Sequence, residues 1–159
     1  MQVLRPRGAG VTMPPDLVWD APGRDWRDSL PSGTGTVGVV AWADDRTVHL
    51  LLGRSDAWSA HGRLLKTARV HLDVPVSWGR LRETRLRLMD AVTVLQWEAA
   101  SVELRPLART DTVQVAVRVA APVRTAELVV RVDPWRRAPR ALDEVELASS
   151  WGWQDTEVV

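Results

Sequence analysis

The sequence contains no cysteine, which excludes disulfide bridges, zinc–thiolate sites and cysteine nucleophiles. It also lacks any apolar run near the ~20 residues that a membrane-spanning helix requires. Residues 1–15 have no continuous apolar stretch, so we expect no signal peptide and, for the chain as written, a cytoplasmic location. The formal net charge is only +1, and we therefore expect neither a nucleic acid nor a membrane among its partners.

Phenylalanine and tyrosine are absent as well, whereas the chain has nine tryptophans. The volume of a hydrophobic core must then come from Trp, Leu and Val. Because large aromatic side chains dominate packing when they are buried, we expect most of these indoles to lie in the core. The 159 residues suffice for one domain with such a core.

Alternation of apolar and polar residues runs through the chain from Val37 to Val132. A period of two is typical of half-buried strands, and turn residues such as Asp44–Arg46 and Asp90–Ala91 separate the runs. The strand-like runs cover residues 37–42, 47–52, 69–74, 84–89, 92–97, 101–105, 111–119 and 125–132. Residues 59–68 alone fit a short helix or a long loop. The pattern predicts an all-β fold, an antiparallel β-sandwich or barrel.

The stretch GTGTVG at residues 33–38 matches the G-x-G-x-x-G fingerprint of dinucleotide-binding proteins. That fingerprint requires a helix after the glycines, whose N-terminus holds the pyrophosphate. Here Pro31 precedes the glycines and a strand-like run follows them, so we expect no nucleotide and no other cofactor. Instead, we expect Gly33, Gly35 and Gly38 to form a structural turn in which the backbone takes φ > 0 or packs closely.

Two segments of the chain resemble the family-95-like glycoside hydrolases. Residues 16–42, DLVWDAPGRDWRDSLPSGTGTVGVVAW, are similar to the opening of these enzymes, which have a Trp-Asp segment, a glycine-rich turn and a strand ending near Trp. Residues 50–72, LLLGRSDAWSAHGRLLKTARVHL, resemble the branch whose N-terminal domain is the domain of unknown function 5703. Residues 130–137, VRVDPWRR, are similar to the last strand of that domain, so the resemblance extends from Asp16 to Arg137.

The chain departs from this family at two positions of the glycine-rich turn. Ser32 stands where Leu is usual, and Thr34 stands where Asn is usual. Asn tolerates the left-handed backbone conformation, which Thr adopts poorly. We therefore expect a local difference in the turn.

The resemblance implies a domain organisation. Residues 16–137 would form a β-sandwich of the super-sandwich type, incomplete in this chain, which in these hydrolases precedes a catalytic (α/α)6 barrel. Residues 1–15 are then a flexible tail, and residues 138–159 are an irregular segment that begins a linker to the missing barrel. The implied partner is that helical barrel domain, and we expect no catalytic residue in this chain.

The polar run from Ser55 to Arg63 is the best candidate for a ligand site. Its side chains could form hydrogen bonds to an oligosaccharide and stack on it. The candidate contact residues are Asp56, Trp58, His61 and Arg63. In the structural interpretation, which we favour, Asp56 accepts backbone hydrogen bonds, Trp58 fills the core and Arg63 pairs with an acid.

No other set of residues has the spacing of a metal or catalytic site. His49, His61 and His71 lack a metal-like spacing to nearby acids, so we expect no metal. His49 and His71 lie 22 residues apart in two predicted strands and could share a site only through folding. Hydrolysis of a glycosidic bond needs two carboxyls across a cleft, and the adjacent acids Asp44–Asp45 and Asp143–Glu144 are best interpreted as solvated surface.

Three functions remain open at this point. The leading hypothesis is a non-catalytic N-terminal accessory domain of a glycoside hydrolase-like protein, packing against a barrel absent from this chain. In that case Trp135–Arg137 and Trp151–Trp153 would face the missing domain. The alternative is a stand-alone carbohydrate-binding module in which residues 56–63 hold an oligosaccharide. The third is a degenerate fragment without activity.

Overall fold

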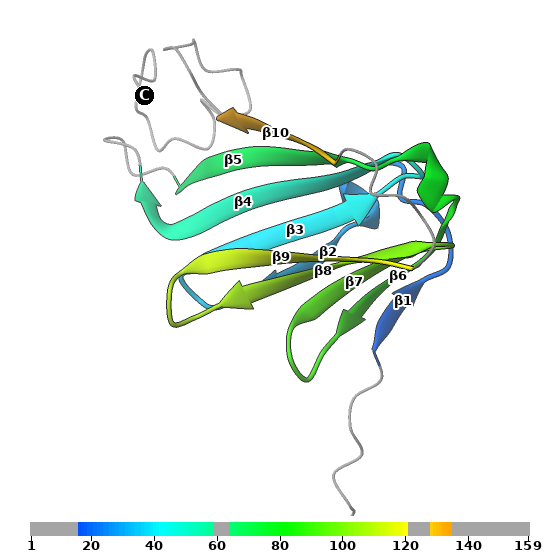
Figure 1. Cartoon of the computed structure of the whole chain (residues 1–159). Helices are drawn as coiled ribbons and strands as arrows, with labels where there is room; N and C mark the ends of the chain where they lie inside the picture. The colour runs from blue at the N-terminus through cyan, green and yellow to red at the C-terminus, as the bar shows by residue number, and fades with distance from the viewer. Residues whose placement is uncertain (1–15, 59–63, 121–127, 135–159) are drawn as a thin grey trace, which may run out of the picture.

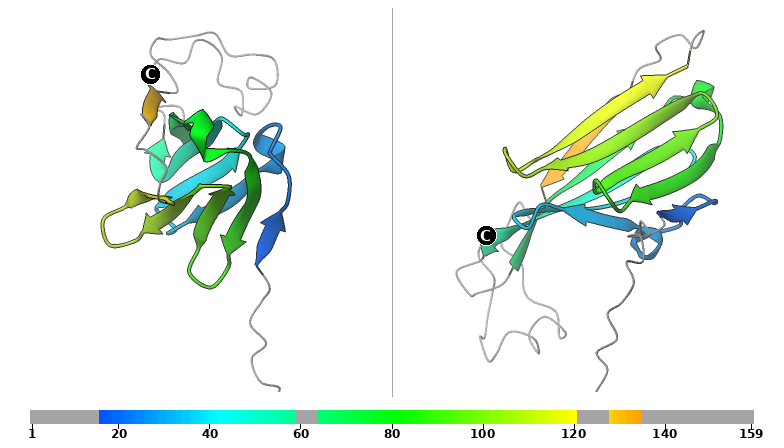
Figure 2. Two further views of the ribbon diagram at one scale, coloured as in Figure 1. Left: turned by 45° about the vertical axis from the view of Figure 1, so that its right-hand side comes forward. Right: turned by 90° about the horizontal axis from the view of Figure 1, so that it is seen from below.

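The computed structural model describes residues 16–58, 64–120 and 128–134. These residues form two five-stranded antiparallel sheets (Figure 1). The order of sheet A is β1-β6-β7-β8-β9, and the order of sheet B is β10-β5-β4-β3-β2. Figure 2 shows the two sheets as two stacked layers. The prediction of an all-β antiparallel sandwich is confirmed.

Most neighbours within each sheet follow one another along the chain. Sheet A consists of β1 (Leu17–Trp19), β6 (Leu81–Arg87), β7 (Val92–Trp97), β8 (Ala100–Leu107) and β9 (Thr112–Val119). Sheet B consists of β2 (Leu30–Gly33), β3 (Val37–Ala43), β4 (Thr47–Trp58), β5 (Leu64–Asp73) and β10 (Val129–Pro134). The chain crosses from sheet A to sheet B after β1, through the 3₁₀ turn η1 (Trp26–Asp28), and returns before β6 through the 3₁₀ turn η2 (Val76–Trp78).

The hydrophobic core lies between the two sheets and follows directly from the period-2 alternation. Every second residue of a strand points to the same face. The inward positions are almost all small or branched apolar residues, among them Val39, Ala41, Val48, Leu50, Leu72, Leu95, Val102 and Leu104. Trp78 and Trp97 pack edge to face with ring centroids 5.6 Å apart, and the Trp97 indole N–H donates to the carbonyl of Asp45 at 3.2 Å.

The tryptophans only partly meet the expectation that most would be core. Among the six in the described residues, Trp78 and Trp97 are buried and Trp42 is half-buried. Trp19, Trp26 and Trp58 are exposed, the last two to 58% and 57%. The expectation was wrong for these three because Val, Leu and Ala alone fill most of the narrow space between the sheets.

Strands β4 and β5 are longer than the sequence pattern indicates. β4 continues to Trp58 and β5 begins at Leu64, with Gly53 opposite Lys66 and Trp58 opposite Leu64 after two register shifts. The expectation of a helix or loop over residues 59–68 is therefore wrong for residues 64–68. Residues 59–63 lie outside the described part of the chain. The register shifts hide the strand period in this stretch, which is why alternation did not reveal it.

The glycine-rich stretch forms the hairpin turn between β2 and β3. Thr34 pairs with Val37: its backbone N–H donates to the Val37 carbonyl at 2.9 Å, and its hydroxyl accepts from the Val37 N–H at 3.1 Å. Gly35 has a φ of +95°, and a Cβ on Gly33 would lie 2.8 Å from the Val37 carbonyl oxygen. Gly38 has neither constraint, since its φ is ordinary and a Cβ there would meet open space. A strand follows these glycines, and Gly35 rather than Thr34 takes the positive φ.

No helix within the described residues is long and apolar enough to span a membrane.

Candidate functional site

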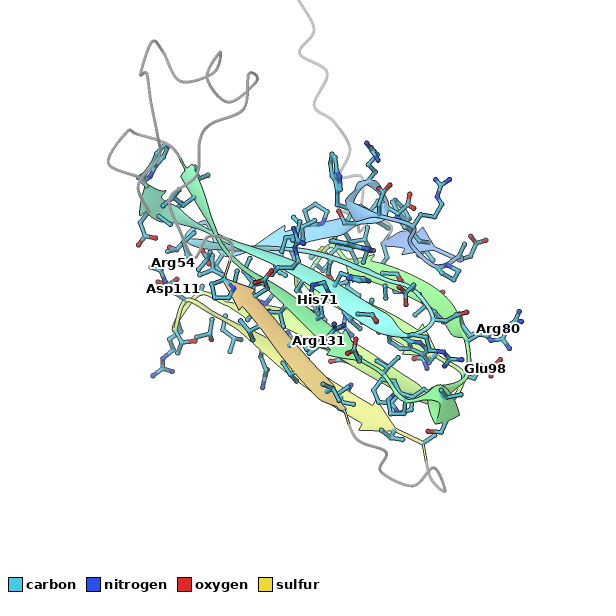
Figure 3. The ribbon with its side chains drawn as sticks, turned by 90° about the horizontal axis from the view of Figure 1, so that it is seen from above. Arg54, His71, Arg80, Glu98, Asp111 and Arg131 are labelled. Carbon is cyan, nitrogen blue, oxygen red and sulfur yellow. The ribbon has the colours of Figure 1, made fainter. Side chains whose placement is uncertain are left out.

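A row of side chains crosses the outer face of sheet B, the face turned away from sheet A. In the register of the four strands, Trp42 lies opposite His49, His49 opposite His71, and His71 opposite Arg131. Figure 3 shows the labelled side chains of His71 and Arg131 close together on this face. Residues directly opposite in neighbouring strands are close enough for side-chain contact. The sheet therefore assembles one continuous row from β3, β4, β5 and β10.

The two histidines of this row are in direct contact. The Nδ1 atoms of His49 and His71 lie 2.9 Å apart, and the rings meet edge to face at a centroid distance of 5.0 Å. On its other side, the His49 ring stacks on the Trp42 indole at 4.9 Å with an interplanar angle of 12°. A hydrogen bond between two imidazoles needs one N–H and one lone pair, so the facing nitrogens share a single proton.

Asp44 extends the histidine pair into a three-membered chain. Its Oδ1 accepts the backbone N–H groups of Arg46 and Thr47 at 2.7 and 2.8 Å, which holds the turn between β3 and β4. Its Oδ2 lies 3.4 Å from His49 Nε2. When neutral His49 donates from Nε2 to Asp44, its Nδ1 accepts from His71, and His71 Nε2 then carries a lone pair. The arrangement leaves a hydrogen-bond acceptor at the His71 end.

The surroundings of His71 favour its neutral form. Burial lowers the pKa of His71 below 6.5, and electrostatic interactions with His49 and Arg131 lower it further, while the carboxylate of Asp73 opposes them. Asp73 itself accepts a hydrogen bond from Arg131 at 2.7 Å and another from the Thr47 hydroxyl at 3.1 Å. The bond from Arg131 is the main reason that the pKa of Asp73 is lowered. His71 is consequently uncharged near neutral pH.

The segment before β2 folds over this face and forms a cleft. The Gly23 N–H donates to the Ala43 carbonyl at 2.7 Å, which ties the segment to the end of β3. A Cβ on Gly23 would lie 3.2 Å from the Trp42 side chain, so the backbone here packs closely against the indole. The cleft is open to solvent and has a volume of about 730 Å³. Its lining combines Arg24, Asp25 and Trp26 of the folded-over segment with Trp42, Asp44, His49, Leu51, Arg69 and His71.

Trp26 lines the cleft from the 3₁₀ turn η1, which local contacts hold in place. The Asp25 carboxylate accepts the backbone N–H of Arg27 at 2.9 Å and so caps η1. The guanidinium of Arg27 lies 5.1 Å from the centre of the Trp26 indole, at cation–π distance. Despite these contacts the Trp26 side chain remains 58% exposed.

The candidate contact residues of the Ser55–Arg63 run do not form this cleft. Ser55–Trp58 is the end of strand β4, not part of a loop. The carboxylate of Asp56 pairs with Arg54 through two hydrogen bonds of 2.9 and 2.7 Å, which lower the pKa of Asp56. Trp58 is 57% exposed, and its indole N–H donates to the Ser55 carbonyl at 2.7 Å. Our structural interpretation, with Trp58 in the core, is wrong, because more than half of the Trp58 surface is exposed to solvent.

The other two candidates, His61 and Arg63, lie outside the described residues. Asp56 and Trp58 are seven to nine positions along β4 from His49, which corresponds to roughly 25–30 Å of extended chain. The described members of the run are therefore well separated from the cleft.

Sequence reasoning missed the cleft because its parts are distant in the chain. His49 and His71 meet only through the pairing of β4 with β5, in which Thr47 lies opposite Asp73. The one available indication was that both histidines occupy outward positions of strongly alternating strands. Within the described residues there is no group of three or more His, Cys, Asp or Glu that could hold a metal ion.

The model of a protein family described as a domain of unknown function (DUF5703) matches residues 18–159. No curated protein matches the sequence.

Proposed function

Because the chain belongs to the family of the domain of unknown function DUF5703, we propose that it is a non-catalytic accessory domain of a glycoside hydrolase-like protein. The link to glycoside hydrolases rests on the resemblance of residues 16–42 and 50–72 described above. In this proposal the sandwich packs against a catalytic helical barrel domain that lies outside residues 1–159. The observation that carries it is the exposure of apolar side chains along one edge of the sandwich.

We call this edge the open edge and define it by the inward-facing valines of β9 and β10. Their side chains are 38–57% exposed, although they continue the buried face of each sheet. The open edge consists of Val115, Val117 and Val119 of β9 with Val130 and Val132 of β10. Val117 lies opposite fully buried Val102, and Val130 lies opposite Leu72, which is only 3% exposed.

A half-covered row of valines supports a docking function. Covering apolar surface contributes about 25 cal/mol per Å², so five partly exposed valines offer a partner domain a substantial gain. Exposed apolar patches are typical of interaction surfaces. The open edge is therefore the surface that we assign to the barrel domain.

The test uses the protein as it occurs in its source organism. Antibodies against the recombinant chain are used to purify the native protein, which is then assayed with aryl glycosides. We expect glycosidase activity in the native material and none in the recombinant chain alone. Native material that contains the chain without any glycosidase activity would contradict the proposal.

A pair of variants on β10 locates the contact. Val130→Lys changes the open edge, and Val129→Lys changes the outer face of the same strand, where Val129 is 43% exposed. If the open edge is the docking surface, Val130→Lys in the chromosomal copy reduces the recovered glycosidase activity and Val129→Lys does not. Equal losses from both variants would contradict this assignment.

A second candidate is the stand-alone carbohydrate-binding module, with the ligand at Asp56 and Trp58. The exposed Trp58 indole, held by its bond to the Ser55 carbonyl, is the observation in its favour. It predicts that Trp58→Ala abolishes retention on a glycan array while the fold is kept. If the recombinant chain retains no glycan and the native material has no glycosidase activity, the degenerate-fragment hypothesis is the one supported.

A further inference from the structure

We propose that the cleft on the outer face of sheet B binds a neutral saccharide, with the Trp26 indole as its stacking surface. The choice of a sugar takes its chemistry from the proposed function, but the site differs from the Asp56–Trp58 candidate.

The cleft has the size and composition of a ligand site. Its volume of about 730 Å³ falls inside the ~300–1,000 Å³ that is common for small-molecule pockets. Such pockets combine apolar or aromatic walls with a few convergent polar groups. Here two indoles, Trp26 and Trp42, share one cleft with the carboxylate of Asp44 and the imidazole of His71.

The exposed indole of Trp26 offers an apolar surface that a bound sugar ring can cover. A pyranose ring presents a face of C–H groups, which packs on an indole in the way that any apolar surface does. Trp26 lines the cleft and is 58% exposed, so part of this large apolar side chain remains in water. Burying that surface is favourable and costs little ordering, because η1 is already fixed by the Asp25 cap.

The polar groups of the cleft match hydroxyls better than an anion. Two arginines and two aspartates line it, namely Arg24, Arg69, Asp25 and Asp44, so their formal charges balance. Neutral His71 adds no charge near pH 7. A hydroxyl both donates and accepts, which suits a wall of carboxylate oxygens, imidazole nitrogens and guanidinium N–H groups. A phosphate or a uronate would find no net positive charge here.

Contacts within the protein hold Trp42 and His49 in place in the cleft before a ligand binds. Trp42 is held between the Gly23 backbone and the stacked His49 ring. His49 is fixed in turn by His71 and Asp44 at 2.9 and 3.4 Å. Preorganisation of this kind reduces the entropy lost on binding.

The experiment screens the purified 159-residue chain on an array of neutral and acidic oligosaccharides. The best neutral ligand is then titrated by calorimetry into wild type, Trp26→Ala and Trp58→Ala. The two tryptophans form a matched pair, because they are 58% and 57% exposed and only Trp26 lines the cleft. Circular dichroism melting verifies that both variants fold.

We expect retention of a neutral glycan, a loss of affinity of at least about tenfold in Trp26→Ala, and a change within about twofold in Trp58→Ala. Affinity should also change little between low and high salt, because no net charge is neutralised. Three results would overturn the proposal: no neutral glycan bound, binding lost in Trp58→Ala but kept in Trp26→Ala, or retention of acidic glycans only, with strong salt dependence.

The outcome is separable from that of the accessory-domain proposal. Glycan binding by the recombinant chain, without glycosidase activity in the native material, would sink only the accessory-domain proposal. Glycosidase activity in the native material, without glycan binding by the chain, would sink only the saccharide site.

Discussion

The middle of the sandwich and its open edge use the same residue type with opposite results. Val102 of β8 is fully buried, whereas Val117 of β9, directly opposite it, is 38% exposed. Both point to the same face of sheet A, and both lie in strands that alternate apolar and polar residues. The difference is the position of the strand: Val102 belongs to the buried cluster between the sheets, whereas Val117 lies on β9, the last strand of sheet A. Alternation therefore tells which face a residue occupies and not whether anything lies on it.

The largest expected effect is in the middle. Trp97→Ala should lower the free energy of unfolding by about 3–5 kcal/mol, because the indole is only 1% exposed, packs on Trp78 and bonds to the Asp45 carbonyl. Urea denaturation of wild type and variant measures it. A loss below about 1 kcal/mol would mean that the core around Trp97 is not closely packed.

The cross-strand pair Val102 and Val117 directly tests the difference between the middle of the sandwich and its open edge. Val102→Ala should cost roughly 2 kcal/mol, since two buried methyl groups are lost and a cavity remains. Val117→Ala should cost less than about 1 kcal/mol, because its side chain is already partly in water. The same denaturation experiment compares the two, and equal losses would break the distinction between middle and edge.

Trp58→Ala should change the free energy of unfolding by less than about 1 kcal/mol, as for other surface sites. The side chain is 57% exposed, and its hydrogen bond is a local one to Ser55. This reverses the expectation from sequence, which placed the indole in the core. A loss of about 3 kcal/mol or more would show that another segment covers Trp58.

The smallest expected effect is a pH dependence of the folding stability, which we attribute to His71 on β5. The folded-state pKa of His71 lies below 6.5, so on acidification the unfolded chain takes up this proton first. The contribution of neutral His71 to the free energy of unfolding is fully present above pH 6.5 and is lost as the pH falls toward the folded-state pKa. His71 faces His49, Arg69, Arg131 and Asp73, and Asp44 contacts His49.

Thermal melts between pH 5 and 8 measure this effect. We expect the melting temperature of the wild type to fall on the acidic side, and the fall to be shallower in His71→Gln. Keeping the pH at or above 5 avoids the protonation of Asp73, whose folded pKa is lowered below 3.8. A steeper fall in His71→Gln would contradict the assignment.

Much of the fold could be predicted because it depends on local rules. The turn at Asp90–Ala91 was readable from residue type, and Ala91 indeed adopts a positive φ of 53°. The hairpin around Asp44 was readable for the same reason, since Asp44 accepts the two N–H groups that follow it. The short strands β1 and β2 escaped prediction, because three or four residues are too few to show a period.

The cleft, in contrast, could not be predicted from the sequence. Asp56 and Trp58 attracted attention because polar and aromatic residues cluster in the sequence there, yet the structure places them at the exposed end of β4. The cleft residues show no such clustering, since Trp26, His49 and His71 come from three separate segments.

By itself, the sequence determined the all-β class, the inward and outward sides of most strands, and the turns that join them. Those features follow from steric and solvation preferences that act within a few residues. Only the tertiary structure decided that His49 meets His71, that the segment before β2 closes a cleft over Trp42, and that the valines of β9 and β10 stay half-covered. Each of these depends on which strands pair and which layer faces which, and that is a property of contacts between residues far apart in the chain.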